Sequence, residues 1–251
     1  MNKIKVSAVS YLNTKPLLYG LFNHPVNDQI TLQLDVPSEC ARKLAMDEVD
    51  LALMPVGALS DFKDWHLISD YCIGADGKVR TVCVYSQVPI EEITDVYLDT
   101  DSRTSVLLCR YLFEHFWKKA VNFNQNKGEE VRVEGTHAAL LIGDKALDQE
   151  QHTAYIYDLA KSWKDMHGLP FAFAVWVSKK ALPPLFIQQF NEALQQGIDH
   201  IDQLVQLIAN TRPHFDVFTY YKDNISFKLD AAKKQSLALF LEVIKPYQQL
   251  K

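Results

Sequence analysis

The chain has 251 residues, of which 48% are hydrophobic and 23% are charged. This length and composition suffice for one large domain or two small ones with a buried core, and they exclude disordered, collagenous and coiled-coil chains. Lys and Arg number 26 against 31 Asp and Glu, a formal net charge of −5, which argues against a nucleic acid as partner.

The start of the chain resembles a strand rather than a targeting signal. Met1–Val6 leads directly into an alternating pattern without the apolar core of a signal peptide. No later apolar run approaches the ~20 residues of a membrane span. We therefore expect a cytoplasmic protein that does not bind a membrane.

Short apolar strands alternate with amphipathic helices over the first two thirds of the chain, which is typical of an α/β protein. Asp158 and Gly168 are the expected N-cap and C′ residues of one helix. Strands are expected at Val6–Val9, Thr31–Val36, Val49–Met54, His66–Asp70, Val79–Ser86, Val96–Asp99, Ala138–Ile142 and Leu169–Val177. Helices are expected after Pro16, at Ser38–Asp47, before Trp117, between Asp158 and Gly168, and at Leu185–Ala209 and Asp230–Gln249, with a polar loop at Asn122–Glu130.

Two changes along the chain suggest two lobes. A strand ends near residue 87 and Pro89 opens a new unit, and the apolar run Leu169–Val177 suggests a second crossing near residue 176. We expect a discontinuous first lobe of residues 1–87 and 177–251 and an inserted second lobe of residues 88–176. A ligand would then bind in the cleft between the lobes.

The cysteines and histidines form no metal-binding pattern. Cys40, Cys72, Cys83 and Cys109 are scattered singly without a CxxC pair, and the eight histidines form no HExxH or HxH group. We expect buried thiols, no disulfide, no metal and no cofactor.

If the strand ends face the cleft, they deliver mainly uncharged hydrogen-bond donors to it. Helix N-termini add free N–H groups and a partial positive charge, so the cleft suits a small carboxylate. Some of these residues could equally cap helices, Thr81 could be a half-buried strand residue, and Arg103 an ion-pair residue. The candidates are Ser10, Asn13, Thr14, Pro55, Thr81, Ser102, Thr104, Ser105 and Asp144.

Familiar catalytic motifs are missing from the sequence, which contains no GxSxG, P-loop, GxGxxG or Cys/His arrangement. Nucleophilic and nucleotide-dependent reactions are therefore disfavoured. Two possibilities stay open, namely binding alone, or proton abstraction and elimination on an anionic substrate held by hydrogen bonds.

Five ordered motifs between residue 3 and about residue 180 resemble one enzyme family, chorismate dehydratase of the futalosine route to menaquinone. The resemblance implies a two-lobe periplasmic-binding-protein type II-like fold. It also implies a cytoplasmic enzyme that converts the dicarboxylate chorismate to 3-[(1-carboxyvinyl)oxy]benzoate and water. The motifs are Ser10–Leu17, Asp50–Val56, Leu98–Asp99 with Ser102–Ser105, Leu140–Leu147 and Gly168–Trp176.

The same resemblance implies roles for single residues. The family's Asn in Tyr-Leu-Asn falls on Asn13, and a cleft hydroxyl falls on Thr81, where the family more often has Ser. We expect elimination through a carbanion at C3, with Asn13 orienting the reacting groups. Thr104 and Ser105 would hold a carboxylate at a helix N-terminus. The proton acceptor would be the substrate's own enolpyruvyl carboxylate, a water or Asp144.

Other functions stay open at this point. A small-carboxylate binding protein of the same fold is weakened by the missing signal peptide, and a ligand-sensing regulator domain would usually bring a DNA-binding helix pair. The sister enzyme 1,4-dihydroxy-6-naphthoate synthase shares the fold but not the Tyr-Leu-Asn-Thr opening. Whether the chain forms a homodimer is also open. Because the net charge is −5 and chorismate is a dianion, recognition would have to be local.

Overall fold

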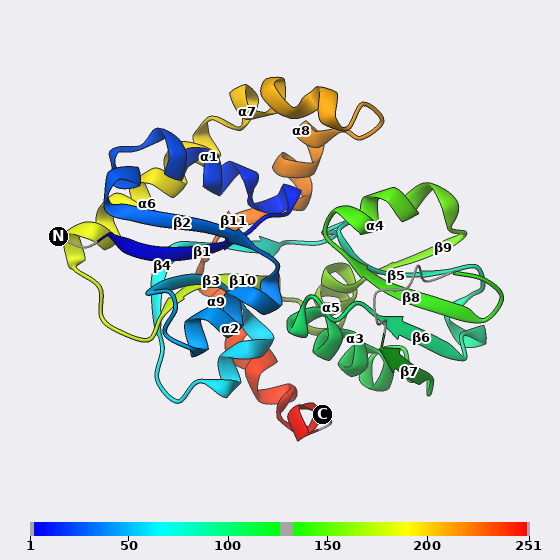
Figure 1. Cartoon of the computed structure of the whole chain (residues 1–251). Coiled ribbons are helices and arrows are strands. Elements are labelled where there is room, and N and C mark those ends of the chain that lie inside the picture. The colour runs from blue at the N-terminus through cyan, green and yellow to red at the C-terminus, as the bar shows by residue number, and fades with distance from the viewer. Residues whose placement is uncertain (1–2, 126–132, 250–251) are drawn as a thin grey trace.

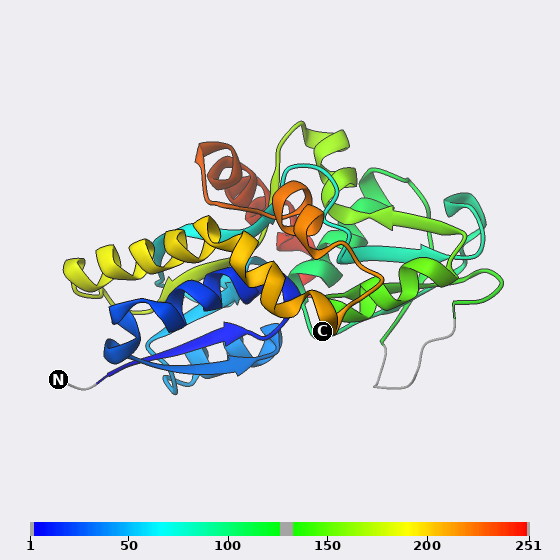
Figure 2. The same cartoon turned by 90° about the horizontal axis from the view of Figure 1, so that it is seen from above.

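Two β-sheets lie side by side in the computed structural model, which describes residues 3–125 and 133–249 (Figure 1). Each sheet carries its own helices, and the view from above shows the same separation (Figure 2). The sheets and their helices therefore form the two lobes of an α/β fold.

The first sheet has six strands in the order β11-β4-β10-β3-β1-β2. Strand β1 pairs in parallel with β2 and β3, whereas β10 is antiparallel to β3 and β4. Every residue of β10 is buried, because a central strand covered on both faces needs a continuous apolar run. The strands are β1 (Ile4–Val9), β2 (Ile30–Asp35), β3 (Leu51–Pro55), β4 (His66–Ala75), β10 (Phe171–Ser178) and β11 (Ser226–Lys228).

Helices cover both faces of the first sheet. In Figure 1, α1 (Lys15–Asn23) and α6 (Pro184–Asp199) pack together on one side, and α2 (Pro37–Ala45) and α9 (Ala231–Val243) lie on the other. Next in the chain after α6 come α7 (Ile201–Ile208) and α8 (Val217–Thr219), which Figure 1 shows reaching toward the second lobe.

The second sheet has five strands in the order β7-β6-β8-β5-β9. Asp158 caps α5 by accepting a hydrogen bond from Lys161 N at 3.1 Å, and Gly168 ends that helix at a φ of 71°, so both predicted helix ends are confirmed. The elements are β5 (Val82–Ser86), β6 (Asp95–Leu98), β7 (Asn122–Gln125), β8 (His137–Ile142) and β9 (Tyr155–Asp158), with α3 (Arg103–His115), α4 (Asp144–Gln149) and α5 (Leu159–His167).

The predicted lobe boundaries place two strands, β5 and β10, in the wrong lobe. The boundary at residue 87 puts β5 in the first lobe, yet β5 pairs with β8 and β9 of the second sheet. The boundary at residue 176 puts most of β10 in the second lobe, yet β10 pairs within the first sheet. A buried strand shows the same apolar run in either sheet, so the sequence pattern could not distinguish them. We infer that the chain crosses between lobes at residues 76–81 and 168–170.

Three short strands, β7, β9 and β11, lie where the sequence pattern predicts none. Asn122–Gln125 forms β7 beside β6 although three of its four residues are polar, because it occupies an edge of the sheet. The remainder of the predicted loop, up to residue 130, continues into the part of the chain outside the described residues. Ser226–Lys228 forms β11 at an edge of the first sheet.

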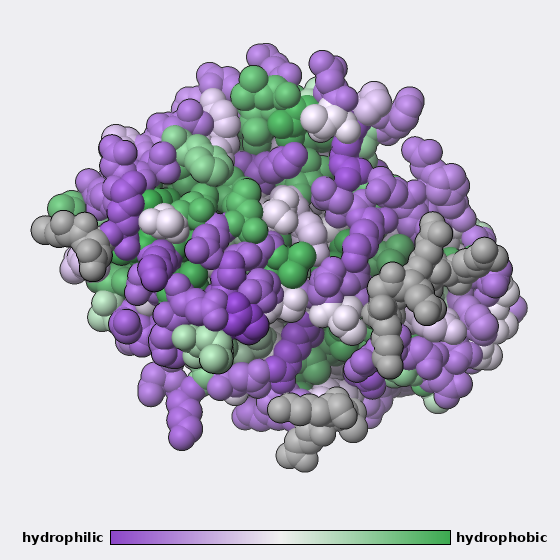
Figure 3. All heavy atoms as spheres, viewed as in Figure 1, coloured by the Kyte–Doolittle hydropathy of each residue, from purple (hydrophilic) through white to green (hydrophobic). Residues whose placement is uncertain are grey.

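Hydrophilic side chains cover most of the face seen in Figure 3, with hydrophobic ones in between. Among the described residues, no helix combines the length and apolar character needed to cross a membrane. All four cysteines are buried and free, which confirms the prediction of buried thiols. Burial raises the pKa of Cys40 and of Cys72 to about 12, so both stay protonated.

Candidate active site

A cavity lies where the two lobes meet, bordered by the ends of β1 and β3 on one side and by the start of α3 and the end of β8 on the other. Its volume is about 40 Å³, room for only a few water molecules. Among the described residues, none of those lining it carries a charged side chain. They are Val9, Tyr11, Asn13, Thr14, Pro37, Pro55, Ile73, Val79, Val82, Ser102, Ser105, Ile142, Gly143, Phe173 and Ala174.

Asn13 and Thr14 follow β1 after three residues, in a short 3₁₀ turn that leads into α1. The Thr14 hydroxyl donates to Asn13 Oδ1 at 3.1 Å, and neither side chain caps the helix. The Asn13 oxygen accepts this bond, and its Nδ2 protons make no hydrogen bond among the described residues, so they can bind a ligand. Thr14 thus orients the Asn13 donor.

Ser102 and Ser105 stand at the first turn of α3. Ser102 caps the helix, since its Oγ accepts from Ser105 N at 3.4 Å and from Ser105 Oγ at 3.1 Å. A hydroxyl oxygen that accepts two bonds still has its own proton to donate. The helix start adds N–H groups and a partial positive charge, so this corner of the cavity can hold a carboxylate oxygen.

Thr104 lies between these two serines in the sequence but does not line the cavity. Its hydroxyl accepts from Gly57 N at 3.0 Å and donates to Phe173 O at 3.2 Å, and the residue is fully buried. A Cβ atom at Gly57 would lie only 2.9 Å from Thr104 Cα, so glycine allows this close approach. Thr104 therefore joins α3 of the second lobe to the first lobe.

Thr81 and Ser10 also lie outside the cavity lining. The Thr81 hydroxyl is 2.9 Å from the Tyr220 hydroxyl, and both residues are buried. Burial, as the largest cause, raises the pKa of Tyr220 well above its usual range, so the pair is neutral. Ser10 is exposed at the end of β1, where its N–H donates to Asp35 O at 3.0 Å. The predicted cleft roles of both residues stay predictions.

Asp144 is the first residue of α4 rather than its cap, which is Gly143. Its Oδ1 accepts from Leu12 N at 3.1 Å, and its Oδ2 is 3.3 Å from the guanidinium of Arg212. Arg212 also pairs with Asp148 at 2.9 Å. Leu12 and Arg212 belong to the first lobe and Asp144 to the second, so these contacts connect the two lobes next to the cavity.

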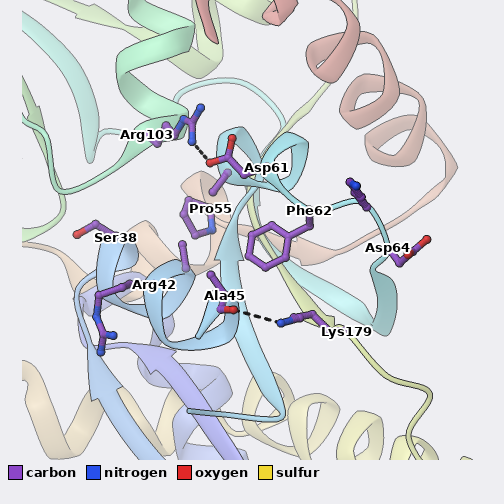
Figure 4. Close-up of a pocket in the computed structure, with 12 residues that line it drawn as sticks. Ser38, Arg42, Ala45, Pro55, Asp61, Phe62, Asp64, Arg103 and Lys179 are labelled. Carbon is purple, nitrogen blue, oxygen red and sulfur yellow. Dashed lines mark hydrogen bonds and ion pairs between the residues drawn. The ribbon is translucent and has the colours of Figure 1, made fainter. Parts of the chain in front are cut away.

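A larger cavity of about 640 Å³ lies on the other side of Pro55, which borders both (Figure 4). Three of its cations, Arg42, Arg103 and Lys179, are already paired. Arg103 points toward Asp61 and forms an ion pair with it, and Lys179 pairs with Asp47 at 2.9 Å. Arg103 is thus an ion-pair residue between α3 and the first lobe, and it does not reach into the smaller cavity.

Tyr11 and Gly143 line the cavity but were not among the predicted site residues. Gly143 adopts a φ of 61°, and a Cβ atom there would lie 2.8 Å from Cδ2 of the Tyr11 ring. Only glycine fits this position without displacing the ring. Both residues occur in motifs that carry the family resemblance, which is the signal that could have identified them. Val9, Pro37, Ile73, Val79 and Val82 also line the cavity, but they lie outside those motifs and have no such signal.

Five of the nine predicted residues lie together in this cavity, namely Asn13, Thr14, Pro55, Ser102 and Ser105. The other four form contacts around it. Over residues 3–125 and 133–249, no three His, Cys, Asp or Glu side chains gather in a way that could hold a metal ion.

Solved structures with the same fold cover nearly the whole chain. A protein from Archaeoglobus fulgidus, AF1704, superposes with a TM-score of 0.75 at 14% identity, covering 99% of this chain and 98% of its own. The periplasmic aliphatic sulphonate binding protein of Escherichia coli superposes with a TM-score of 0.60 at 14% identity, covering 97% and 93%. The fold is therefore that of the periplasmic binding proteins, as the resemblance implies.

Two sequence relatives are named chorismate dehydratase. The one from Thermus thermophilus is 25% identical over 230 residues, which is 83% of this chain and 84% of that protein. The one from Campylobacter jejuni is 25% identical over 248 residues, which is 94% and 96%. A family model described as menaquinone biosynthesis matches residues 4–246, both lobes and the cavity included. The chain therefore belongs to the menaquinone biosynthesis family.

Proposed function

We propose that this protein is a chorismate dehydratase, which removes water from chorismate to give 3-[(1-carboxyvinyl)oxy]benzoate. The observation that carries the proposal is the match, over most of the chain, to two proteins of that name. The cavity between the lobes supports it, because this reaction needs a site that orients a small dianion and keeps water away.

The cavity supplies hydrogen-bond donors without a fixed positive charge. Asn13 Nδ2, the Ser102 hydroxyl and the start of α3 are the donors that face a ligand there. Donors of this kind can stabilise negative charge that develops during a reaction in a site closed to water. In our proposal α3 holds one substrate carboxylate, while Asn13 stabilises charge at the reacting carbons.

The reaction breaks the C3–H and C4–O bonds of chorismate and leaves an aromatic ring, so the substrate itself provides the driving force. A base must accept the C3 proton, and the departing hydroxyl leaves as water after taking up a proton. The lining contains no carboxylate, imidazole or amine among the described residues. We therefore assign proton acceptance to the enolpyruvyl carboxylate of the substrate or to a water that the substrate carries into the cavity.

The lobes must move apart for this function. A cavity of about 40 Å³ is far below the ~300 Å³ or more of typical small-ligand sites. Residues 76–81 and 168–170 are the two connections about which the lobes would rotate. The contacts of Thr104 with Gly57 and of Asp144 with Leu12 would break on opening and re-form on closure.

The same proposal covers the partners and the site of action. The substrate is a small dicarboxylate, and elimination of water requires no redox or group-carrying cofactor. We propose that the protein acts in the cytoplasm, where chorismate is made, without a nucleic acid or membrane partner.

Incubation of the purified protein with chorismate tests the proposal. We expect a new aromatic absorbance and, by mass spectrometry, a product lighter than chorismate by one water. A binding protein of this fold would instead bind chorismate without forming the product. The sister enzyme would leave chorismate unchanged and release 1,4-dihydroxy-6-naphthoate from its own substrate, so both substrates are tested in parallel.

A further inference from the structure

Tyr11 brings a phenol from the first lobe against the second lobe at the edge of the cavity. It follows β1 and precedes the turn that carries Asn13. Its ring lies against Gly143, the residue that caps α4 of the second lobe. Because the two residues belong to different lobes, the position of the ring depends on lobe closure.

The hydroxyl of Tyr11 is shielded from solvent and makes no hydrogen bond of normal geometry among the described residues, although the carboxylate of Asp101 lies near enough to raise its pKa. A buried donor left unpaired is costly, and such groups in native structures usually have a ligand or a catalytic purpose. Most of the other polar groups around the cavity have partners, as the Thr104 and Thr14 hydroxyls do. A phenol without a well-formed hydrogen bond among them is available to a ligand, which would compete with Asp101 for its proton.

The surroundings keep this phenol protonated. Burial is the largest cause and the carboxylates of Asp101, Asp99 and Asp144 add to it, so the pKa of Tyr11 lies well above its usual range. Tyr11 is therefore a donor and is not suited to accept the C3 proton.

Those three carboxylates are themselves paired with cations. Lys145 Nζ lies 3.3 Å from Asp99 and 3.0 Å from Asp101, and Arg212 pairs with Asp144. Their charges are thus partly compensated, which lessens the repulsion of an anionic ligand next to Tyr11.

We propose that Tyr11 is a substrate-binding residue that donates its hydroxyl proton to a carboxylate oxygen of chorismate in the closed protein. This inference rests on the proposed function. The contact with Gly143 holds the ring in place only when the lobes meet, so Tyr11 couples substrate recognition to closure. It binds the carboxylate that the start of α3 does not hold.

The variant Tyr11→Phe tests the inference by removing only the hydroxyl. We expect KM for chorismate to rise about ten- to a hundredfold, as for loss of a hydrogen bond to a charged group, with a smaller change in kcat. The melting temperature should stay the same or rise, since an unpaired buried donor is removed. If the Tyr11 hydroxyl had a purely structural role, Tyr11→Phe would instead lower the melting temperature.

Tyr19→Phe is the matched control, since the Tyr19 hydroxyl bonds Gln203 at 3.2 Å and does not line the cavity. Its KM should equal that of the unaltered protein. Gly143→Ala is a second variant, because its Cβ atom would displace the Tyr11 ring. Gly143→Ala should also raise KM. The increase should be smaller in a protein that already carries Tyr11→Phe.

Two outcomes would overturn the inference while leaving the proposed function intact. One is an unchanged KM for Tyr11→Phe in a protein that converts chorismate. The other is a fall in melting temperature that accounts for the whole loss. If the unaltered protein forms no product from chorismate, the proposed function fails first, and the assignment of Tyr11 to chorismate fails with it.

Discussion

Two sets of polar side chains surround the junction of the lobes, and they differ in whether their hydrogen bonds are already made. Tyr11, Asn13 and Ser102 line the cavity and each keeps a donor for a ligand. Thr81 and Thr104, by contrast, are bonded to protein groups and lie outside the lining. The difference separates groups that can bind substrate from groups that hold the lobes in place.

The difference does not follow from residue type or from position at a strand or helix end. Thr104 and Ser105 are neighbours in the first turn of α3, yet one joins the lobes and the other supports Ser102 in the cavity. In a helix, adjacent residues point about 100° apart, so neighbours in one polar motif face different surroundings. Whether a hydroxyl is free to bind substrate therefore depends on its contacts with the other lobe, and not on the sequence motif that contains it.

Replacing Asn13 by alanine should have the largest effect, because it removes the donor that we propose stabilises charge at the reacting carbons. We expect kcat/KM for chorismate to fall about a hundred- to a thousandfold, the usual loss for one donor that stabilises developing charge. Steady-state kinetics measured by product absorbance would check this.

Asn23→Ala is the matched control, since the Asn23 amide donates to Tyr19 O at 2.8 Å on the outside of α1. It should leave kcat/KM unchanged. Full turnover by Asn13→Ala would show that the cavity residues do not carry the reaction, and the contrast between the two sets of side chains would then lose its functional meaning.

Replacing Thr81 by valine tests the second set of side chains, those that bond to other protein groups. The change leaves the buried Tyr220 hydroxyl without its partner, so we expect the free energy of unfolding to fall by about 1–3 kcal/mol. Urea unfolding would measure this. Tyr220→Phe breaks the same bond from the other side, and Thr81→Ser keeps it.

If Thr81 acts only through this bond, kcat should survive in all three variants. A loss of kcat in Thr81→Val that Tyr220→Phe does not share would instead place the Thr81 hydroxyl on the substrate. That result would contradict the division drawn from the structure and would favour the role implied by the family resemblance.

Much of the fold was predictable from local patterns, because apolar periodicity and helix caps are properties of short segments. The cap at Asp158 and the end at Gly168 are examples. The assignment of β5 and β10 to sheets was not, since pairing joins strands far apart in the chain. The sequence shows that a strand is buried, but not which sheet buries it.

The candidate site shows the same limit. Asn13, Ser102 and Ser105 were predictable because they lie at an element start in motifs of the family. Tyr11 was missed because an aromatic residue after a strand usually belongs to the core. Only the three-dimensional arrangement shows that its hydroxyl is unpaired and that Gly143 makes room for its ring.

The contacts of Arg212 offer the smallest expected effect and the most direct test of lobe closure. Arg212 pairs with Asp144 and Asp148, and these side chains are partly exposed, so the two pairs together should contribute about 1 kcal/mol. Arg212→Ala should therefore raise KM for chorismate by no more than about fivefold, with kcat unchanged. Added salt should reduce the difference, because screening weakens exposed ion pairs.

Lys161→Ala provides the control for Arg212→Ala, since Lys161 pairs with Asp165 within α5 of a single lobe. It should leave KM unchanged at every salt concentration. Asp144→Asn keeps an acceptor for Leu12 N and removes only one of the two ion pairs of Arg212, so it should raise KM by less than Arg212→Ala does. If Asp144→Asn abolished turnover instead, Asp144 would act on the substrate as the proton acceptor. It would then no longer belong with the groups that only join the lobes.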